Sequence, residues 1–129
     1  MKCCKGVFEG GGVRGIAHVG AACGMEQEGY RFESVAGSSA GAVVAALIAS
    51  GYECRELKRE METLNYRKFR GRDMVDNFGT VGKLLSLLFS LGVYNNRYLE
   101  KWMEQVLSER GIRTFGDLHR RGRRLIIPV

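Results

Sequence analysis

The order of apolar and polar positions predicts a strand, a glycine turn and a helix, and this order then occurs a second time. Residues 6–9 form a short extended run, and the apolar positions of residues 16–28 fit a helix that ends at Gly29. Residues 32–36 form a second extended run, which a small-residue helix over residues 42–50 follows. Because parallel strands need a crossover between them, this repetition favours a mainly parallel sheet covered by helices.

The second half of the chain is predicted to be largely helical. A polar helix over residues 54–64 precedes a basic loop over residues 66–80, and residues 81–91 are predicted to form an amphipathic or buried helix. Asn96 is a candidate cap for a further helix. The apolar stripes of the first and last of these helices, which we expect in the core, contain Leu57, Met61, Leu64, Leu99, Trp102, Met103, Val106 and Leu107.

The last residues predict a third strand that has no further partner in the sequence. Residues 114–118 read as a helical turn or loop, and residues 124–129 as a strand. A sheet of three strands would leave a long edge unpaired, which proteins usually avoid. We therefore expect an α/β fold with a mainly parallel sheet covered by helices, of which this sequence is a truncated portion.

The composition fits one globular domain and indicates its cellular location and the state of its cysteines. The chain has 129 residues, 45% apolar and 26% charged, with a single proline. No secretory signal is visible and no apolar run approaches the roughly 20 residues of a membrane span, so a cytoplasmic location is expected. Cys3, Cys4, Cys23 and Cys54 show no metal-ligand spacing, and the same reasoning predicts reduced thiols and no bound metal.

The net charge of +6 favours anionic partners. Arginines gather over residues 67–72 and 120–124, and a phospholipid surface or a nucleic acid could take this charge. No aromatic residues interleave the second run, so nucleic-acid binding is not expected, and a solvated loop is the simpler interpretation. Residues 81–91 together with the arginine-rich loop are a candidate for peripheral contact with an anionic membrane.

Gly37-Ser38-Ser39-Ala40-Gly41 fits the G-x-S-x-G pattern of a nucleophile elbow. In such an elbow the serine lies on a strained turn between a strand and a helix, and both elements are predicted here. The flanking glycines, Gly37 and Gly41, are needed because side chains would collide with the neighbouring strand and helix. The position also puts Ser39 at a helix N-terminus, which favours developing negative charge.

The first glycine cluster, residues 10–15, also follows a strand and opens a helix. Its successive N–H groups lack side-chain cover, as an anion-binding nest requires, and in an acyl hydrolase they would hold the oxyanion of the tetrahedral intermediate. Because consecutive parallel strands end side by side, both turns can face one substrate carbonyl. An alternative is a dinucleotide fingerprint formed by Gly10, Gly12 and Gly15, but the second strand ends without the acidic residue that would hold the ribose.

Taken together, the two turns resemble the patatin-like phospholipase family, which has a G-G-G-x-R-G loop before a G-x-S-x-G elbow. Residues 114–118 and the last strand are also similar to the family. The resemblance implies a three-layer α/β/α sandwich, of which residues 1–129 are the N-terminal portion of a single domain. It also implies a lipid acyl hydrolase acting on acyl lipids or phospholipids through a Ser-Asp dyad, without metal or organic cofactor. It assigns Ser39 as the nucleophile. The oxyanion and substrate-binding residues that it implies are Gly10, Gly11, Gly12, Arg14 and Gly15.

The sequence departs from the family pattern in two places. Glu9 stands where the family usually has aspartate, and the D-G-[GA] motif that carries the dyad aspartate does not occur, because none of Asp73, Asp76 and Asp117 precedes a glycine. A serine without a base is a poor nucleophile. The base is therefore expected outside this sequence, and an inactive binding or regulatory module is the alternative.

The two histidines offer no obvious replacement for the missing base. His18 lies one turn into the first predicted helix and is expected to be a packed or loop-facing side chain. His119 is predicted to lie in the basic loop before the last strand.

Overall fold

The computed structural model describes residues 1–10, 15–63 and 96–128. The loop predicted over residues 66–80 and the helix predicted over residues 81–91 lie outside this part of the chain. The described strands and helices are, in chain order, β1 (Lys2–Phe8), α1 (Gly15–Gln27), β2 (Tyr30–Gly37), α2 (Ala40–Ala49), α3 (Cys54–Thr63), α6 (Asn96–Glu109), α7 (Phe115–Arg120) and β3 (Arg124–Ile126).

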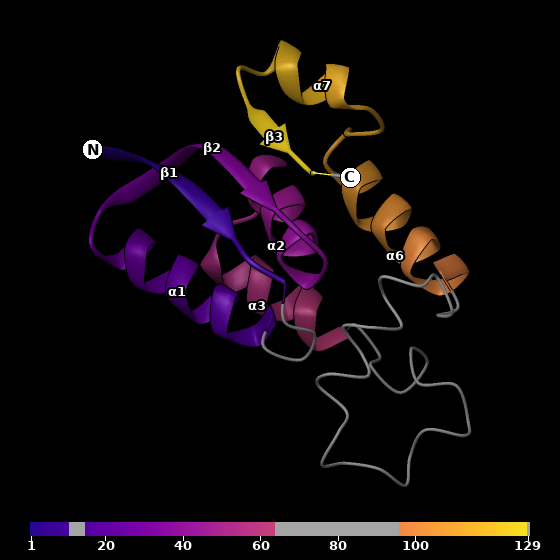
Figure 1. The fold of residues 1–129 in the computed structure, drawn as a ribbon, viewed down its shortest axis with the longest axis horizontal. Helices are drawn as coiled ribbons and strands as arrows, with labels where there is room; N and C mark the ends of the chain where they lie inside the picture. Colours follow the sequence, from indigo (N-terminus) through magenta and orange to yellow (C-terminus); the bar gives the residue numbers. More distant parts are fainter. Residues whose placement is uncertain (11–14, 64–95, 129) are drawn as a thin grey trace, which may run out of the picture.

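The three described strands form one parallel sheet in the order β1-β2-β3, and their arrows point the same way in Figure 1. The register pairs Phe8 with Gly37, so β1 and β2 end together. Helices connect and flank the strands. The predicted α/β fold with a parallel sheet is thereby confirmed.

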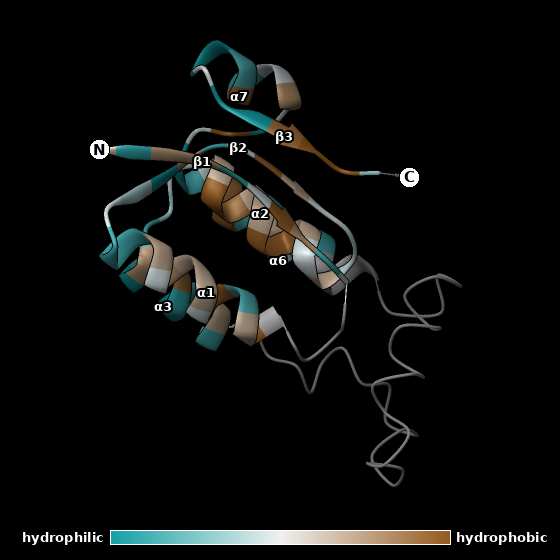
Figure 2. Ribbon diagram, turned by 60° about the vertical axis from the view of Figure 1, so that its left-hand side comes forward, coloured by the Kyte–Doolittle hydropathy of each residue, from teal (hydrophilic) through white to brown (hydrophobic). Residues whose placement is uncertain are grey.

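The helices that follow β1 and β2 cover one face of this sheet. Figure 2 shows α1, α2 and α3 on the same side of the strands. This is expected because right-handed crossovers that advance in one direction along a sheet place their helices on one face. The other face carries a row formed by Val7, Ala36 and Ile126, in which the two large side chains are 83% and 54% exposed. The second helical layer of the expected sandwich remains a prediction.

The core lies between the covered face of the sheet and the helices. Val44 and Leu47 of α2 are fully buried, because this helix consists almost entirely of small and apolar residues. The predicted stripe residues of α3 and α6 contribute Leu57, Trp102 and Val106. Side chains at positions 64 and 99 lie outside the described part, so only the remaining stripe positions are confirmed as core or as packed against it.

The element ends differ from the prediction where pairing partners decide them. β1 begins at Lys2, four residues early, because its first residues pair with the start of β2 across an irregularity between Cys4 and Lys5. β3 ends at Ile126 and does not continue to residue 129. Its last pair is made with β2, and Pro128 has no N–H to donate.

The basic loop expected before β3 is in part a helix. Thr114 caps α7 through a capping box, so the turn predicted over residues 114–118 extends to Arg120. His119 therefore lies in the last turn of α7 and not in a loop, and the prediction for this residue was wrong.

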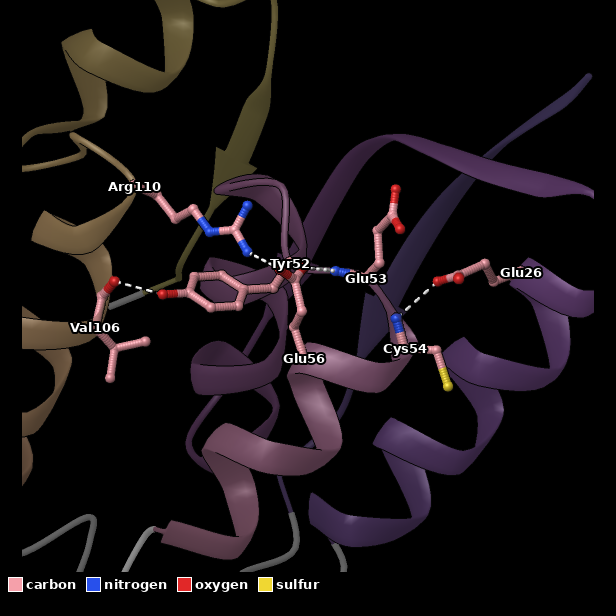
Figure 3. Close-up of polar contacts among 7 residues, drawn as sticks. All are labelled: Glu26, Tyr52, Glu53, Cys54, Glu56, Val106 and Arg110. Carbon is pink, nitrogen blue, oxygen red and sulfur yellow. Dashed lines mark hydrogen bonds and ion pairs between the residues drawn. The ribbon is translucent and has the colours of Figure 1, made fainter.

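The expectation of four reduced cysteines is also wrong. Cys23 of α1 and Cys54 at the start of α3 form a disulfide, with their Cα atoms 4.8 Å apart. The two residues are 31 positions apart, and no local pattern announces a bond that only the packing of α1 against α3 creates. Glu26 accepts a hydrogen bond from the Cys54 backbone N–H at 2.8 Å (Figure 3). Cys3 and Cys4 are free.

Side chains also connect α3 to α6, in a group that we call the α3–α6 junction: Tyr52, Glu56, Val106 and Arg110 (Figure 3). The buried Tyr52 hydroxyl donates to the carbonyl of Val106 at 2.7 Å. Arg110 forms an ion pair with Glu56 and lies over the Tyr52 ring, 4.3 Å from its centroid. The pKa of Glu56 is lowered, first by the N–H of Glu53 and then by Arg110.

Candidate active site

The glycine turn and the serine elbow meet where β1 and β2 end. Ser38 donates its backbone N–H to the carbonyl of Phe8 at 3.1 Å. A Cβ atom built on Gly10 would lie 3.1 Å from the Cβ of Ser39. The first residue of the glycine turn therefore packs against the predicted nucleophile, as expected for consecutive parallel strands.

Ser39 has a backbone conformation that L-residues rarely adopt. Its φ is 55° and its ψ is −127°, and it is the one non-glycine residue with positive φ in the described part of the chain. Such a conformation costs on the order of 1–3 kcal/mol and persists only when the surrounding structure enforces it. A strained serine between a strand and a helix is the geometry of a nucleophile elbow.

The surroundings that enforce this turn explain the two flanking glycines. A Cβ atom on Gly37 would lie 2.3 Å from the carbonyl oxygen of Gly41. A Cβ atom on Gly41 would lie 2.2 Å from the carbonyl oxygen of Phe8 and 2.5 Å from that of Glu9. No side chain fits at either position. The two glycines of the G-x-S-x-G pattern are therefore required by the close backbone contacts around the elbow.

The Ser39 side chain is not used to cap the helix that it precedes. Ser39 is the N-cap residue of α2, yet its side chain makes no capping hydrogen bond. Backbone hydrogen bonds form the turn instead. The N–H of Gly41 donates to the carbonyl of Ser38, and the N–H of Ala42 donates to the carbonyl of Ser39. The hydroxyl thus stands half-buried at the positive end of α2, where negative charge is favoured.

His18 of α1 reaches back to the glycine turn. Its Nε2 atom lies 2.7 Å from the carbonyl oxygen of Glu9, and its ring packs edge-on against Phe8 with centroids 5.5 Å apart. The expectation of a loop-facing side chain is confirmed. The partner, a backbone carbonyl next to Gly10, could not be read from the sequence.

Most of the other predicted residues of the glycine turn lie outside the described part of the chain. Gly11, Gly12 and Arg14 lie outside the described residues, and Gly15 is the first residue of α1. Their role in holding an oxyanion stays a prediction.

Among the described residues, one aspartate is present, and it is engaged elsewhere. Asp117 accepts hydrogen bonds from the backbone N–H groups of Arg113 and Thr114, which lower its pKa to about 2. A carboxylate so strongly stabilised in its charged form is a weak base. Asp73 and Asp76 lie outside the described residues, and within residues 1–10, 15–63 and 96–128 no aspartate is a partner for Ser39.

The described side chains and helices also bear on metal binding and on membrane insertion. Within residues 1–10, 15–63 and 96–128, no three His, Cys, Asp or Glu side chains gather as a metal site would require. None of the described helices is both long and apolar enough to cross a bilayer.

Comparison with known proteins identifies the family. The sequence profile described as "Patatin-like phospholipase" matches residues 6–125. A Bacillus subtilis (strain 168) protein, the uncharacterized protein YqhO, is 44% identical over 123 residues, which is 94% of this chain. The match spans 42% of that relative, so the chain corresponds to about two fifths of its length. With both motifs meeting at one end of the sheet, the chain belongs to the patatin-like phospholipase family.

Proposed function

We propose that residues 1–129 are the N-terminal portion of a patatin-like domain that hydrolyses acyl esters of lipids, with Ser39 as the nucleophile. The observation that carries the proposal is the strained turn of Ser39 packed against Gly10. A backbone conformation this costly is maintained by the fold around it. The Ser39 hydroxyl takes no part in capping α2. Family membership supports a lipid substrate.

The reaction follows from a serine in this position. The Ser39 oxygen attacks the ester carbonyl, and its proton passes to a base and then to the departing alcohol. The resulting acyl-enzyme is cleaved when water attacks the same carbon, which releases the carboxylic acid and restores the hydroxyl. The base in this proposal is an aspartate outside the present sequence, because none of Asp73, Asp76 and Asp117 precedes a glycine as the family's dyad aspartate does. Asp117 is moreover engaged in the cap of α7.

The oxyanion hole in this proposal begins with the backbone N–H of Gly10. Removal of one such donor typically slows an acyl transfer by ~10²- to 10³-fold. Gly11 and Gly12 would supply the neighbouring amides, and Arg14 would support the loop or an anionic headgroup. Gly37 and Gly41 serve the elbow.

The environment of the enzyme is part of the proposal. The net charge of +6 supports contact with an anionic membrane surface, and a cytoplasmic location is retained from the sequence. The Cys23–Cys54 bond is the observation that weighs against that location, because disulfides persist mainly in oxidising compartments.

A second candidate is a patatin-like module that binds lipid without cleaving it. The observation that favours it is the one described aspartate, whose carboxylate is committed to the cap of α7. In this case the elbow would be retained for packing alone.

A fluorophosphonate probe tests the enzyme proposal. We expect it to label Ser39 in a form of the protein that continues to an Asp-Gly-Gly or Asp-Gly-Ala motif, and to leave Ser39→Ala unlabelled. Ser38→Ala is the matched control, because this exposed neighbour shares the turn and should not change labelling. In residues 1–129 alone, labelling should be slower by ~10⁴-fold or more, because one member of a catalytic unit is missing.

Equal labelling of the Ser39→Ala variant would remove the nucleophile assignment. A longer form that binds phospholipid vesicles but reacts with no probe would favour the binding module.

A further inference from the structure

The hydrogen bond between His18 and Glu9 has a direction that its partners decide. A carbonyl oxygen only accepts, so the Nε2 atom of His18 must carry a hydrogen and donate it at 2.7 Å. This donor links the first turn of α1 to the peptide bond between Glu9 and Gly10. His18 therefore holds the backbone of the glycine turn through this donor.

The planarity of the peptide bond carries this constraint to Gly10. No cis peptide bond occurs among the described residues, so the Glu9 carbonyl and the Gly10 N–H point in opposite directions within one plane. A bond that fixes the carbonyl also fixes the N–H. Gly10 is the residue whose Cβ position lies 3.1 Å from the Cβ of Ser39.

The same carbonyl is confined on a second side by the elbow. A Cβ atom on Gly41 would lie 2.5 Å from the Glu9 oxygen, so this oxygen is in close contact with the start of α2. The His18 ring is itself held edge-on by Phe8, with an interplanar angle of 88°. The Glu9–Gly10 peptide is thus fixed between α1 and the elbow that presents Ser39.

We propose that His18 is a positioning residue of the oxyanion hole, which acts by orienting the Gly10 N–H through the Glu9–Gly10 peptide plane. This inference rests on the proposed function, because it assigns the Gly10 amide to the oxyanion. Loss of the His18 donor leaves the peptide free to rotate away from the reacting carbonyl. A misplacement of about 1 Å in such a group can cost ~10²-fold in rate.

Three substitutions separate the hydrogen bond from the packing of the ring. In His18→Gln the side-chain amide nitrogen takes nearly the place of Nε2 and can still donate to Glu9. In His18→Asn the amide is too short to reach that place, and in His18→Phe the ring contact with Phe8 remains without a donor. His18→Gln is therefore the rescue, and the other two remove the bond.

Steady-state kinetics on a short acyl ester, with the longer form of the protein, give the first readout. We expect kcat of His18→Asn and His18→Phe to fall by ~10- to 10²-fold with KM nearly unchanged, because the oxyanion contact is made only in the transition state. His18→Gln should stay within ~3-fold of the wild type. Equal kcat in all four proteins, or equal losses that include His18→Gln, would overturn the proposal.

NMR of the 129-residue chain gives a readout that needs no activity. We expect the ¹⁵N shift of His18 to show a protonated Nε2, and the Gly10 amide ¹⁵N shift to move in His18→Asn and His18→Phe but not in His18→Gln. If Ser39 proves unreactive, the proposed function fails, and these shifts still decide the orienting role. A Gly10 amide ¹⁵N shift that is the same in all variants would contradict the orienting role. If His18→Asn does not fold, the shift in His18→Phe alone decides the question.

Discussion

The elbow around Ser39 and the α3–α6 junction are stabilised by different means. At the elbow, backbone atoms touch so closely that Gly37 and Gly41 have no room for a side chain, and Ser39 is forced to a positive φ. At the α3–α6 junction, the conformations are ordinary and side chains make the contacts. The buried Tyr52 hydroxyl bonds to Val106, and Arg110 pairs with Glu56 (Figure 3).

The comparison teaches where strain is tolerated in a fold. A strained turn such as the one at Ser39 needs rigid surroundings, and unstrained helices joined by side-chain contacts can supply them. Helix α1 serves both regions, because His18 reaches the glycine turn at one end and Cys23 bonds to α3 nearer the other. The elbow region supplies the candidate chemistry, and the contacts of α3 with α1 and α6 supply stability.

The largest expected effect on stability comes from the disulfide that joins α1 to α3. Reduction of the Cys23–Cys54 bond should lower the free energy of unfolding by about 4 kcal/mol, because it frees a loop of 31 residues in the unfolded chain. Urea denaturation with and without a reductant measures this change. The double variant Cys23→Ala/Cys54→Ala should no longer respond to the reductant.

Cys3→Ala/Cys4→Ala is the matched control for that experiment, because both residues are free thiols and the variant should respond to the reductant as the wild type does. An unfolding midpoint that reduction leaves unchanged in the wild-type chain would show that this bond does not stabilise it.

The next largest effect on stability is expected at the strained elbow around Ser39. Gly41→Ala should lower the free energy of unfolding by about 2 kcal/mol, because the new methyl group would overlap the Phe8 carbonyl. It should also displace the elbow and slow the labelling of Ser39. Gly24→Ala in α1 is the control, because nothing lies within 4 Å of its Cβ position. That change should stabilise the protein by about 0.5–1 kcal/mol, and equal effects of both substitutions would remove the distinction between the two regions.

The smallest expected effect concerns acid. The pKa of Asp117 is about 2 in the folded protein, against an ordinary value of 3.8, because backbone N–H groups bind its charged form. Its contribution to stability is therefore complete above about pH 4 and is lost as the pH falls through about 2. Asp117→Asn should flatten the stability profile in that range, whereas Glu104→Gln on the exposed face of α6 should not. Identical profiles for both variants would contradict the capping role.

The elbow could be predicted from the sequence because its cause is local. Five consecutive residues contain both glycines and the serine, and the strand and helix around them have clear apolar patterns. The capping box at Thr114 and Asp117 is equally local, although the sequence pattern predicts only a helical turn or loop over residues 114–118. Motifs within one turn of chain report directly on backbone conformation.

The remaining features depend on contacts between distant residues. The Cys23–Cys54 bond and the hydrogen bond from Tyr52 to Val106 join positions 31 and 54 residues apart, and no periodicity announces either of them. The early start of β1 depends in the same way on its pairing with β2. Such features follow from tertiary packing, which local patterns do not encode.

The most direct test of the account is a crystal structure of the longer protein after reaction with a fluorophosphonate. We predict a covalent bond from phosphorus to the Ser39 oxygen, with the phosphoryl oxygen about 2.7–3.1 Å from the Gly10 nitrogen. A probe attached to another residue, or a phosphoryl oxygen turned away from the Gly10 amide, would contradict the proposal that the two turns form one site.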